Sequence, residues 1–117
     1  MSRSQRLTAI LPCNNLDASE TFYARLGFTR RGGDDNYRIL SNGLGGELHL
    51  NPAVEGWLTP GRNPFGLYLY IETVDELAAK MGSRAEDKPW GMYEFAVSDP
   101  DQTLVRVGWP SKPAASG

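Results

Sequence analysis

Residues 7–28, LTAILPCNNLDASETFYARLGF, are the stretch that decides the fold. The stretch opens with a short apolar run, Leu7–Leu11, which Pro12 closes, and this pattern is typical of a β-strand. Apolar residues then recur every four positions from Ala18 to Leu26, which predicts one face of a helix. Gly27 follows the last of them and favours the end of the helix there. A strand and a helix with one apolar face predict a sheet that the helix covers.

The rest of the chain extends this pattern and then repeats it. After the first helix we expect three strands, at Phe28–Arg31, Tyr37–Ser41 and Glu47–Leu50, and then a loop at Asn51–Pro64. A strand at Phe65–Ile71 follows, then a second helix, and then two strands at Trp90–Val97 and Leu104–Val107. Thr73 and Glu76 form the pattern of a capping box at the start of the second helix. The order predicts an α+β fold made of one module used twice.

The domain organisation follows from this repeat. We expect a single domain over residues 1–117, with module one at about residues 6–50 and module two at about residues 66–109. The segment between the second helix and the next strand is only Ser83–Pro89, so the second module is expected to be shortened, with one strand missing or vestigial. Residues 111–117 are small and polar and are expected to form a flexible tail.

Composition narrows the function classes. The net charge is −2, from 14 acidic and 12 basic residues, which does not provide the basic surface that nucleic acid attracts. Apolar runs stay far below the roughly 20 residues that span a bilayer. Residues 1–6 have no apolar core behind them and do not resemble the start of a secretory signal, and Cys13 is the single cysteine. We expect a cytoplasmic protein that binds neither nucleic acid nor membrane.

Two motifs carry a resemblance to a known family. The first comprises Leu7–Pro12, Leu16-Asp17 and Phe22–Phe28; the second is Asp99–Val107, preceded by Trp90-Gly91. Together they resemble the vicinal oxygen chelate (glyoxalase/bleomycin resistance/dioxygenase) superfamily, and among its members the chain is most similar to the small bleomycin resistance proteins. The family usually has glycine at Gln102. The resemblance implies two βαβββ-type modules whose curved sheets surround a groove, in a homodimer.

Enzymes of this superfamily hold a divalent metal in the groove, and the resemblance assigns its four ligand positions to Thr8, Glu47, Gly66 and Arg106. A threonine hydroxyl is a poor ligand for a transition metal, glycine has no side chain, and arginine carries a fixed positive charge. His49 lies two residues from Glu47, but two ligands are fewer than such a site normally recruits. We therefore expect no metal, no cofactor and no catalytic residue.

Strand alternation suggests which side chains line the groove. The parity that places Gly66 there also places Tyr68 and Tyr70 there, whereas Val105 and Val107 face the helix. With residues taken from the resemblance and from the loop, the expected groove contains Tyr37, Glu47, His49, Trp57, Phe65, Tyr68, Tyr70, Trp90, Glu94 and Arg106. Such aromatic and charged groups suit planar, partly cationic ligands. Arg106 can pair with Glu47 or can face a carboxylate or phosphate of a ligand.

Three functions are consistent with these residues. The first is a non-catalytic protein that sequesters a bleomycin-type or other aromatic antibiotic in the groove. Because segment 83–89 is shorter than in the bleomycin resistance proteins, part of the groove wall would be missing, which favours a smaller ligand. The second is a metal-dependent glyoxalase- or dioxygenase-type enzyme, or a metal-free enzyme with Glu47 or Glu94 as general base. The third is a dimeric interaction module whose aromatic residues are structural.

Overall fold

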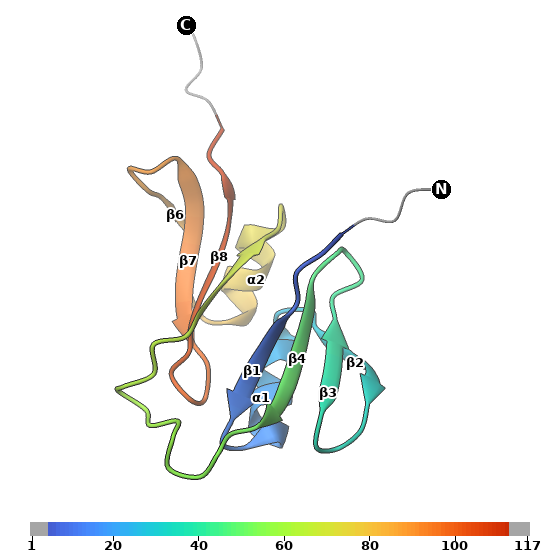
Figure 1. The fold of residues 1–117 in the computed structure, drawn as a ribbon. Helices are drawn as coiled ribbons and strands as arrows, with labels where there is room; N and C mark the ends of the chain where they lie inside the picture. The colour runs from blue at the N-terminus through green and yellow to red at the C-terminus, as the bar shows by residue number, and fades with distance from the viewer. Residues whose placement is uncertain (1–4, 113–117) are drawn as a thin grey trace, which may run out of the picture. The chain divides into compact units, whose positions relative to one another are not determined.

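The computed structural model describes residues 5–112 of the chain. The chain divides into two compact units at Thr59 and Pro60, and the described part of each unit, residues 5–59 and 60–112, is treated by itself. Each unit has a four-stranded sheet and one helix, as Figure 1 shows. The α+β fold with two modules is thereby confirmed. The groove between the sheets and the homodimer stay predictions, and most of the expected tail, 113–117, lies outside the described residues.

The first unit contains, in chain order, β1 (Ala9–Cys13), α1 (Leu16–Arg25), β2 (Thr29–Gly33), β3 (Arg38–Ser41) and β4 (Glu47–Pro52). The strand order is β1-β4-β3-β2, with β1 parallel to β4 and the other pairs antiparallel. The side chain of Asn15 caps α1 by accepting the amide of Ala18 at 3.0 Å. The helix packs on β4, where Leu48 and Leu50 are buried. Alternate residues of β4 face the opposite, open side.

The second unit contains β5 (Gly66–Tyr70), α2 (Val74–Lys80), β6 (Glu86–Asp87), β7 (Met92–Ser98) and β8 (Leu104–Pro110). Its strand order, β5-β8-β7-β6, follows the first sheet: the first strand of the unit is parallel to the last. The helix packs on β7 and β8, over the buried side chains of Phe95, Val105 and Val107. Strand β6 has only two residues, so the prediction of a vestigial strand is confirmed.

Four local predictions were wrong. Pro12 lies inside β1 rather than closing it, because β1 is an edge strand, where proline is tolerated. Thr73 precedes α2 without a side-chain capping hydrogen bond, because its backbone is not in the extended conformation that a capping residue usually adopts. The strand predicted from Trp90 begins at Met92, because Gly91 has a φ of +85° and closes a turn by donating its amide to Lys88. Tyr37 precedes β3, because its amide is bound by the carboxylate of Asp34 in the preceding turn.

The second family motif forms the tight turn between β7 and β8. The carboxylate of the buried Asp99 accepts the amides of Asp101 and Thr103 at 2.8 and 2.9 Å. Gln102 lies at the turn with a φ of +64°. This left-handed conformation accounts for the glycine that the family usually has at this position, since glycine adopts it without steric cost. Neither helix of the described chain is long and apolar enough to cross a membrane.

Candidate functional site

The open face of the first sheet carries a hydrogen-bonded chain of three predicted site residues. The hydroxyl of Tyr37 lies 2.8 Å from Nδ1 of His49, and Nε2 of His49 lies 3.1 Å from Oε1 of Glu47. Glu47 and His49 stand on this face because they alternate along β4 with Leu48 and Leu50, which face α1. Both nitrogens of the His49 ring are satisfied when Nε2–H donates to Glu47 and Nδ1 accepts the Tyr37 hydroxyl.

Glu47 is already neutralised within its own unit. The hydroxyl of Thr8 donates to its Oε1 at 3.2 Å, and the guanidinium of Arg6 lies 3.2 Å from its Oε2. The hydrogen bond from His49, the charge of Arg6 and the hydroxyl of Thr8 lower the pKa of Glu47, against an opposing effect of partial desolvation. A carboxylate that is so well stabilised as an anion is a weak general base.

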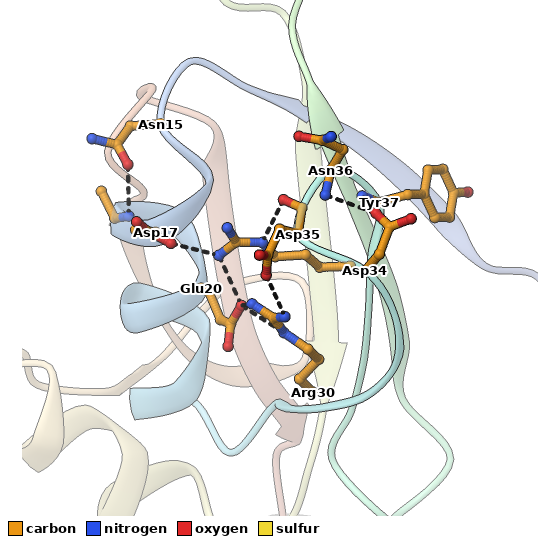
Figure 2. A network of polar contacts seen from close by, with 10 residues as sticks. Asn15, Asp17, Glu20, Arg30, Asp34, Asp35, Asn36 and Tyr37 are labelled. Atoms are coloured by element: carbon orange, nitrogen blue, oxygen red, sulfur yellow. Dashed lines mark hydrogen bonds and ion pairs between the residues drawn. The ribbon is translucent and has the colours of Figure 1, made fainter.

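The other side of this sheet holds an ionic network that sequence reasoning missed (Figure 2). Arg38 is only 6% exposed, and its guanidinium lies 2.8 Å from Asp17 and 3.0 Å from Glu20. Arg30 pairs with Glu20 at 2.7 Å and with Asp35 at 3.0 Å. The available signal was strand parity: Arg38 alternates with Leu40 and therefore points toward α1.

This network is structural in character. Figure 2 shows the ring of Tyr37 pointing away from it. The hydrogen bond from Arg30 is the largest cause that lowers the pKa of Glu20, and the hydrogen bond to Asp17 is the largest cause that raises the pKa of Arg38. Each arginine has two carboxylate partners, so the network binds α1 to the β2–β3 hairpin.

The open face of the second sheet gathers five predicted site residues: Tyr68, Tyr70, Trp90, Glu94 and Arg106. Tyr68 on β5 is registered with Arg106 on β8, and the intervening residues of β8, Val105 and Val107, are buried on the side of α2. The predicted alternation on this strand is confirmed. Trp90 lies just before β7. Its indole nitrogen donates a hydrogen bond to the carboxylate of Glu94, which places the Trp90 side chain on the same face.

Glu94 is the centre of this face. Its side chain is 3% exposed, and its Oε1 accepts hydrogen bonds from the indole of Trp90 at 2.8 Å and from the hydroxyl of Tyr68 at 3.2 Å. The guanidinium of Arg106 lies 3.9 Å from Oε2, at the outer limit of an ion pair. The carboxylate therefore points inward and is surrounded by donors. A buried carboxylate with such partners positions the groups around it rather than meeting a ligand directly.

The aromatic side chains around Glu94 remain open to solvent. Trp90 is 58% exposed and Tyr70 is 63% exposed. The rings of Tyr68 and Tyr70 pack with centroids 4.5 Å apart, and the guanidinium carbon of Arg106 lies 6.0 Å from the centroid of the Trp90 ring. Exposed flat rings beside a cation form a surface on which a planar ligand can stack.

Two predicted site residues lie outside these two clusters. Trp57 stands on the loop after β4, in the first unit, and is 82% exposed, whereas the neighbouring Leu58 is buried. The core position on this loop is therefore taken by Leu58. Phe65 precedes β5 in the second unit and is 45% exposed. Arg106 binds Glu94 in its own unit, and its pairing with Glu47, which belongs to the other unit, stays a prediction.

The residues at the four family metal positions do not fit a metal. The hydroxyl of Thr8 donates to Glu47, and both oxygens of Glu47 are bound within the chain. Gly66 and Arg106 provide no electron-pair donor. Across residues 5–112, no group of three or more histidine, cysteine, aspartate and glutamate side chains is placed to hold a metal ion.

Among the comparisons with known proteins, only the comparison with solved structures finds similar proteins. No protein-family model matches the chain, and a search of curated proteins finds no match either. Among solved structures, a bleomycin-binding protein complexed with bleomycin is 26% identical, with a TM-score of 0.78 over 92% of this chain and 100% of that chain. A bleomycin resistance determinant encoded on the transposon Tn5 is 25% identical, with a TM-score of 0.79 over 93% of this chain and 100% of that chain.

More distant structures share the fold. A lactoylglutathione lyase from Agrobacterium tumefaciens is 19% identical, with a TM-score of 0.69 over 92% of this chain and 95% of that chain. Binding proteins and a lyase are therefore built on the same architecture, and fold alone does not choose between them. The two four-stranded sheets, the two helices and these structural neighbours identify the chain as a protein of the vicinal oxygen chelate fold that resembles the bleomycin resistance proteins.

Proposed function

We propose that the chain binds a small aromatic molecule, a bleomycin-type drug or another aromatic antibiotic, and sequesters it without chemical turnover. The observation that carries this proposal is the open face of the second sheet, where Tyr70 and Trp90 are more than half exposed around the buried Glu94. Large aromatic side chains that remain exposed beside a fixed polar centre are typical of a binding surface. The similarity to a bleomycin-binding protein complexed with bleomycin supports this class of ligand.

The experiment is a fluorescence titration with metal-free and copper-loaded bleomycin. Trp90→Ala removes one wall of the proposed surface. Trp109→Ala is a matched control, because Trp109 is 41% exposed on β8 but shares the parity of Val107 and so lies on the side of α2. We expect saturable quenching at about one ligand per chain that Trp90→Ala weakens about tenfold or more. Equal weakening by both variants, or a flat response in the wild type, contradicts binding of bleomycin at this face.

An enzyme is the competing function, and one arrangement favours it. The chain Tyr37–His49–Glu47 resembles the hydrogen-bonded chains that move a proton in acid–base catalysis. Its carboxylate is fully bound, however, and its pKa is lowered, so it is suited to orienting His49 rather than to removing a proton. The carboxylate of Glu94 likewise accepts two hydrogen bonds on one of its oxygens, which suits it to positioning Tyr68 and Trp90.

The dimeric interaction module is separated from the binding protein by a different measurement. Sedimentation with and without ligand reports the oligomeric state. A module whose aromatic residues form only a protein interface predicts that Tyr70→Ala and Trp90→Ala change this state. A binding protein predicts that they change ligand affinity. The high exposure of both side chains within the described chain is compatible with either, so the two readouts are compared on the same variants.

A further inference from the structure

The charges on the open face of the second sheet are arranged asymmetrically. Of the side chains of β5–β8 that share this face, two are carboxylates. Glu94 is buried and accepts two hydrogen bonds, and Glu86, which is registered opposite it on β6, lies 2.5 Å from the ammonium of Lys88. Both carboxylates are therefore occupied by donors from the chain itself. A cationic group of a ligand would therefore have to share each carboxylate with a partner that the chain already supplies.

Arg106 differs from these carboxylates. Its side chain is 45% exposed, and within residues 5–112 its polar contact is the long ion pair with Glu94 at 3.9 Å. A guanidinium has five N–H donors in a planar fork, and this pair does not use them at hydrogen-bond distance. The negative partner lies beneath the surface and the positive group lies at it. The Glu94–Arg106 pair has no net charge, but a ligand at this face contacts the N–H donors of Arg106.

The aromatic surface lies directly beside those donors. The Trp90 ring is 6.0 Å from the guanidinium carbon of Arg106, and Tyr68 is registered with Arg106 on the adjacent strand and packs on Tyr70. A ring of a ligand that stacks on Trp90 or Tyr70 would place a substituent of that ring near the guanidinium. A carboxylate matches the fork of arginine in a bidentate pair.

From this arrangement we infer that the preferred ligand of the second sheet is a planar aromatic carboxylate rather than an aromatic cation. The inference rests on the proposed function, because it names the charge of the ligand that the aromatic surface takes. It departs from the partly cationic ligand that the sequence suggested, and the reason is the state of the two carboxylates predicted in the groove, Glu47 and Glu94. Both are bound within the chain.

The test is calorimetric titration with three compounds of one shape: naphthalene-2-carboxylate, the neutral 2-carboxamide and the cationic 2-carboxamidine. We expect the carboxylate to bind about tenfold more tightly than the carboxamide, because a hydrogen bond to a charged group is stronger than one between neutral groups. The carboxamidine is expected to bind most weakly. Higher salt should reduce the difference in affinity between the three compounds, because it screens the exposed guanidinium.

Three variants assign the preference to Arg106. Arg106→Gln should make the affinities for the carboxylate and the carboxamide equal. Arg106→Lys should keep part of the preference for the carboxylate, since lysine retains the positive charge but lacks the planar guanidinium. Arg84→Gln is the control, because it removes the same charge from an exposed position in the same unit. Circular dichroism and thermal unfolding confirm that each variant is folded.

The outcomes separate the two proposals. A carboxylate preference that is lost in Arg106→Gln and kept in Arg84→Gln supports the inference. Equal binding of carboxylate and carboxamide, tightest binding of the carboxamidine, or a preference that survives Arg106→Gln overturns it and leaves aromatic binding intact. Absence of binding by all three compounds also overturns it, and the bleomycin titration then decides independently on the proposed function.

Discussion

The hydroxyl of Tyr68 on β5 reaches Glu94 on β7, across the strand that separates them. The intervening residue of β8 is Gly108, which is registered with Glu94 on one side and with Tyr70 on the other. A β-carbon built on Gly108 would lie 2.3 Å from the Tyr68 hydroxyl and 2.8 Å from Cβ of Glu94. Glycine at this position is therefore what allows the hydrogen bond of 3.2 Å to form.

Gly108→Ala should destabilise the protein by about 1–3 kcal/mol, because the added methyl group forces Tyr68 and Glu94 apart. The measurement is urea-induced unfolding. Gly66→Ala is the matched control on the adjacent strand, where an added β-carbon would meet its nearest neighbour at an ordinary 3.8 Å. In the Tyr68→Phe background the cost of Gly108→Ala should fall, since the clashing hydroxyl is absent. An unchanged free energy of unfolding in Gly108→Ala would contradict the crossing of Tyr68 over this strand.

Tyr68 should titrate at an unusually high pH. Burial, followed by the charge of Glu94 and the hydrogen bond to it, raises the pKa of Tyr68 from 10.0 to about 12. A folded-state pKa above the unfolded one stabilises the fold fully below about pH 10, and this contribution is lost as the pH rises toward 12. Ultraviolet absorbance of the tyrosinate should show the late titration. Glu94→Gln should lower this pKa while leaving it above 10, because burial remains the largest cause.

Removal of Arg38 should cost more than removal of an exposed arginine. Arg38→Gln should lower the free energy of unfolding by about 1–3 kcal/mol, because it breaks hydrogen bonds to charged partners and leaves Glu20 with fewer donors. Arg31→Gln is the control, since Arg31 lies exposed on β2. Thermal unfolding compares the two variants. Equal midpoints for Arg38→Gln and Arg31→Gln would show that the network contributes little.

The same network should make stability depend on acid pH. The pKa of Glu20 is lowered, first by the hydrogen bond from Arg30 and then by Arg38, against partial desolvation. A lowered folded-state pKa stabilises the fold above the unfolded value of 4.5, and this contribution is lost as the pH falls through the folded pKa. Glu20→Gln should therefore be less stable than the wild type at pH 7, and the difference should shrink below pH 4.5. A constant difference from pH 7 to pH 3 would argue against this linkage.

Divalent metal should not stabilise the protein. A ligand that binds only the folded state raises the temperature midpoint of unfolding by mass action. The residues at the four family metal positions do not fit a metal; they are Thr8, Glu47, Gly66 and Arg106. We expect the midpoint to be the same with a chelator and with added Zn²⁺, Ni²⁺ or Mn²⁺. The variant Thr8→His is a positive comparison, because it would place a second imidazole beside Glu47. A midpoint that rises with metal in the wild type would reopen the enzyme hypothesis.

Much of the fold was accessible from the pattern of the chain. Apolar spacing predicted α1 and α2, and the short segment 83–89 predicted the two-residue β6. Alternation also predicted the open and covered faces of β5 and β8. These features are local, because the periods of helix and strand determine which side chains share a face. The errors lie at element ends, at Thr73 and Trp90, where single hydrogen bonds and a positive φ at Gly91 decide the boundary.

The sequence by itself determined the two modules, the side chains that share a face on β5 and β8, and the mismatch with a metal. Only the tertiary structure decided which of the charged groups are occupied. Glu47 is bound by Arg6, Thr8 and His49, and Glu94 is bound by Tyr68 and Trp90. Three of these partners, Tyr68, Thr8 and Arg6, lie 26, 39 and 41 residues from the carboxylate they bind, so no local period reports them. The partnerships leave Arg106 as the group that faces outward, because an ion pair 3.9 Å long does not use its donors.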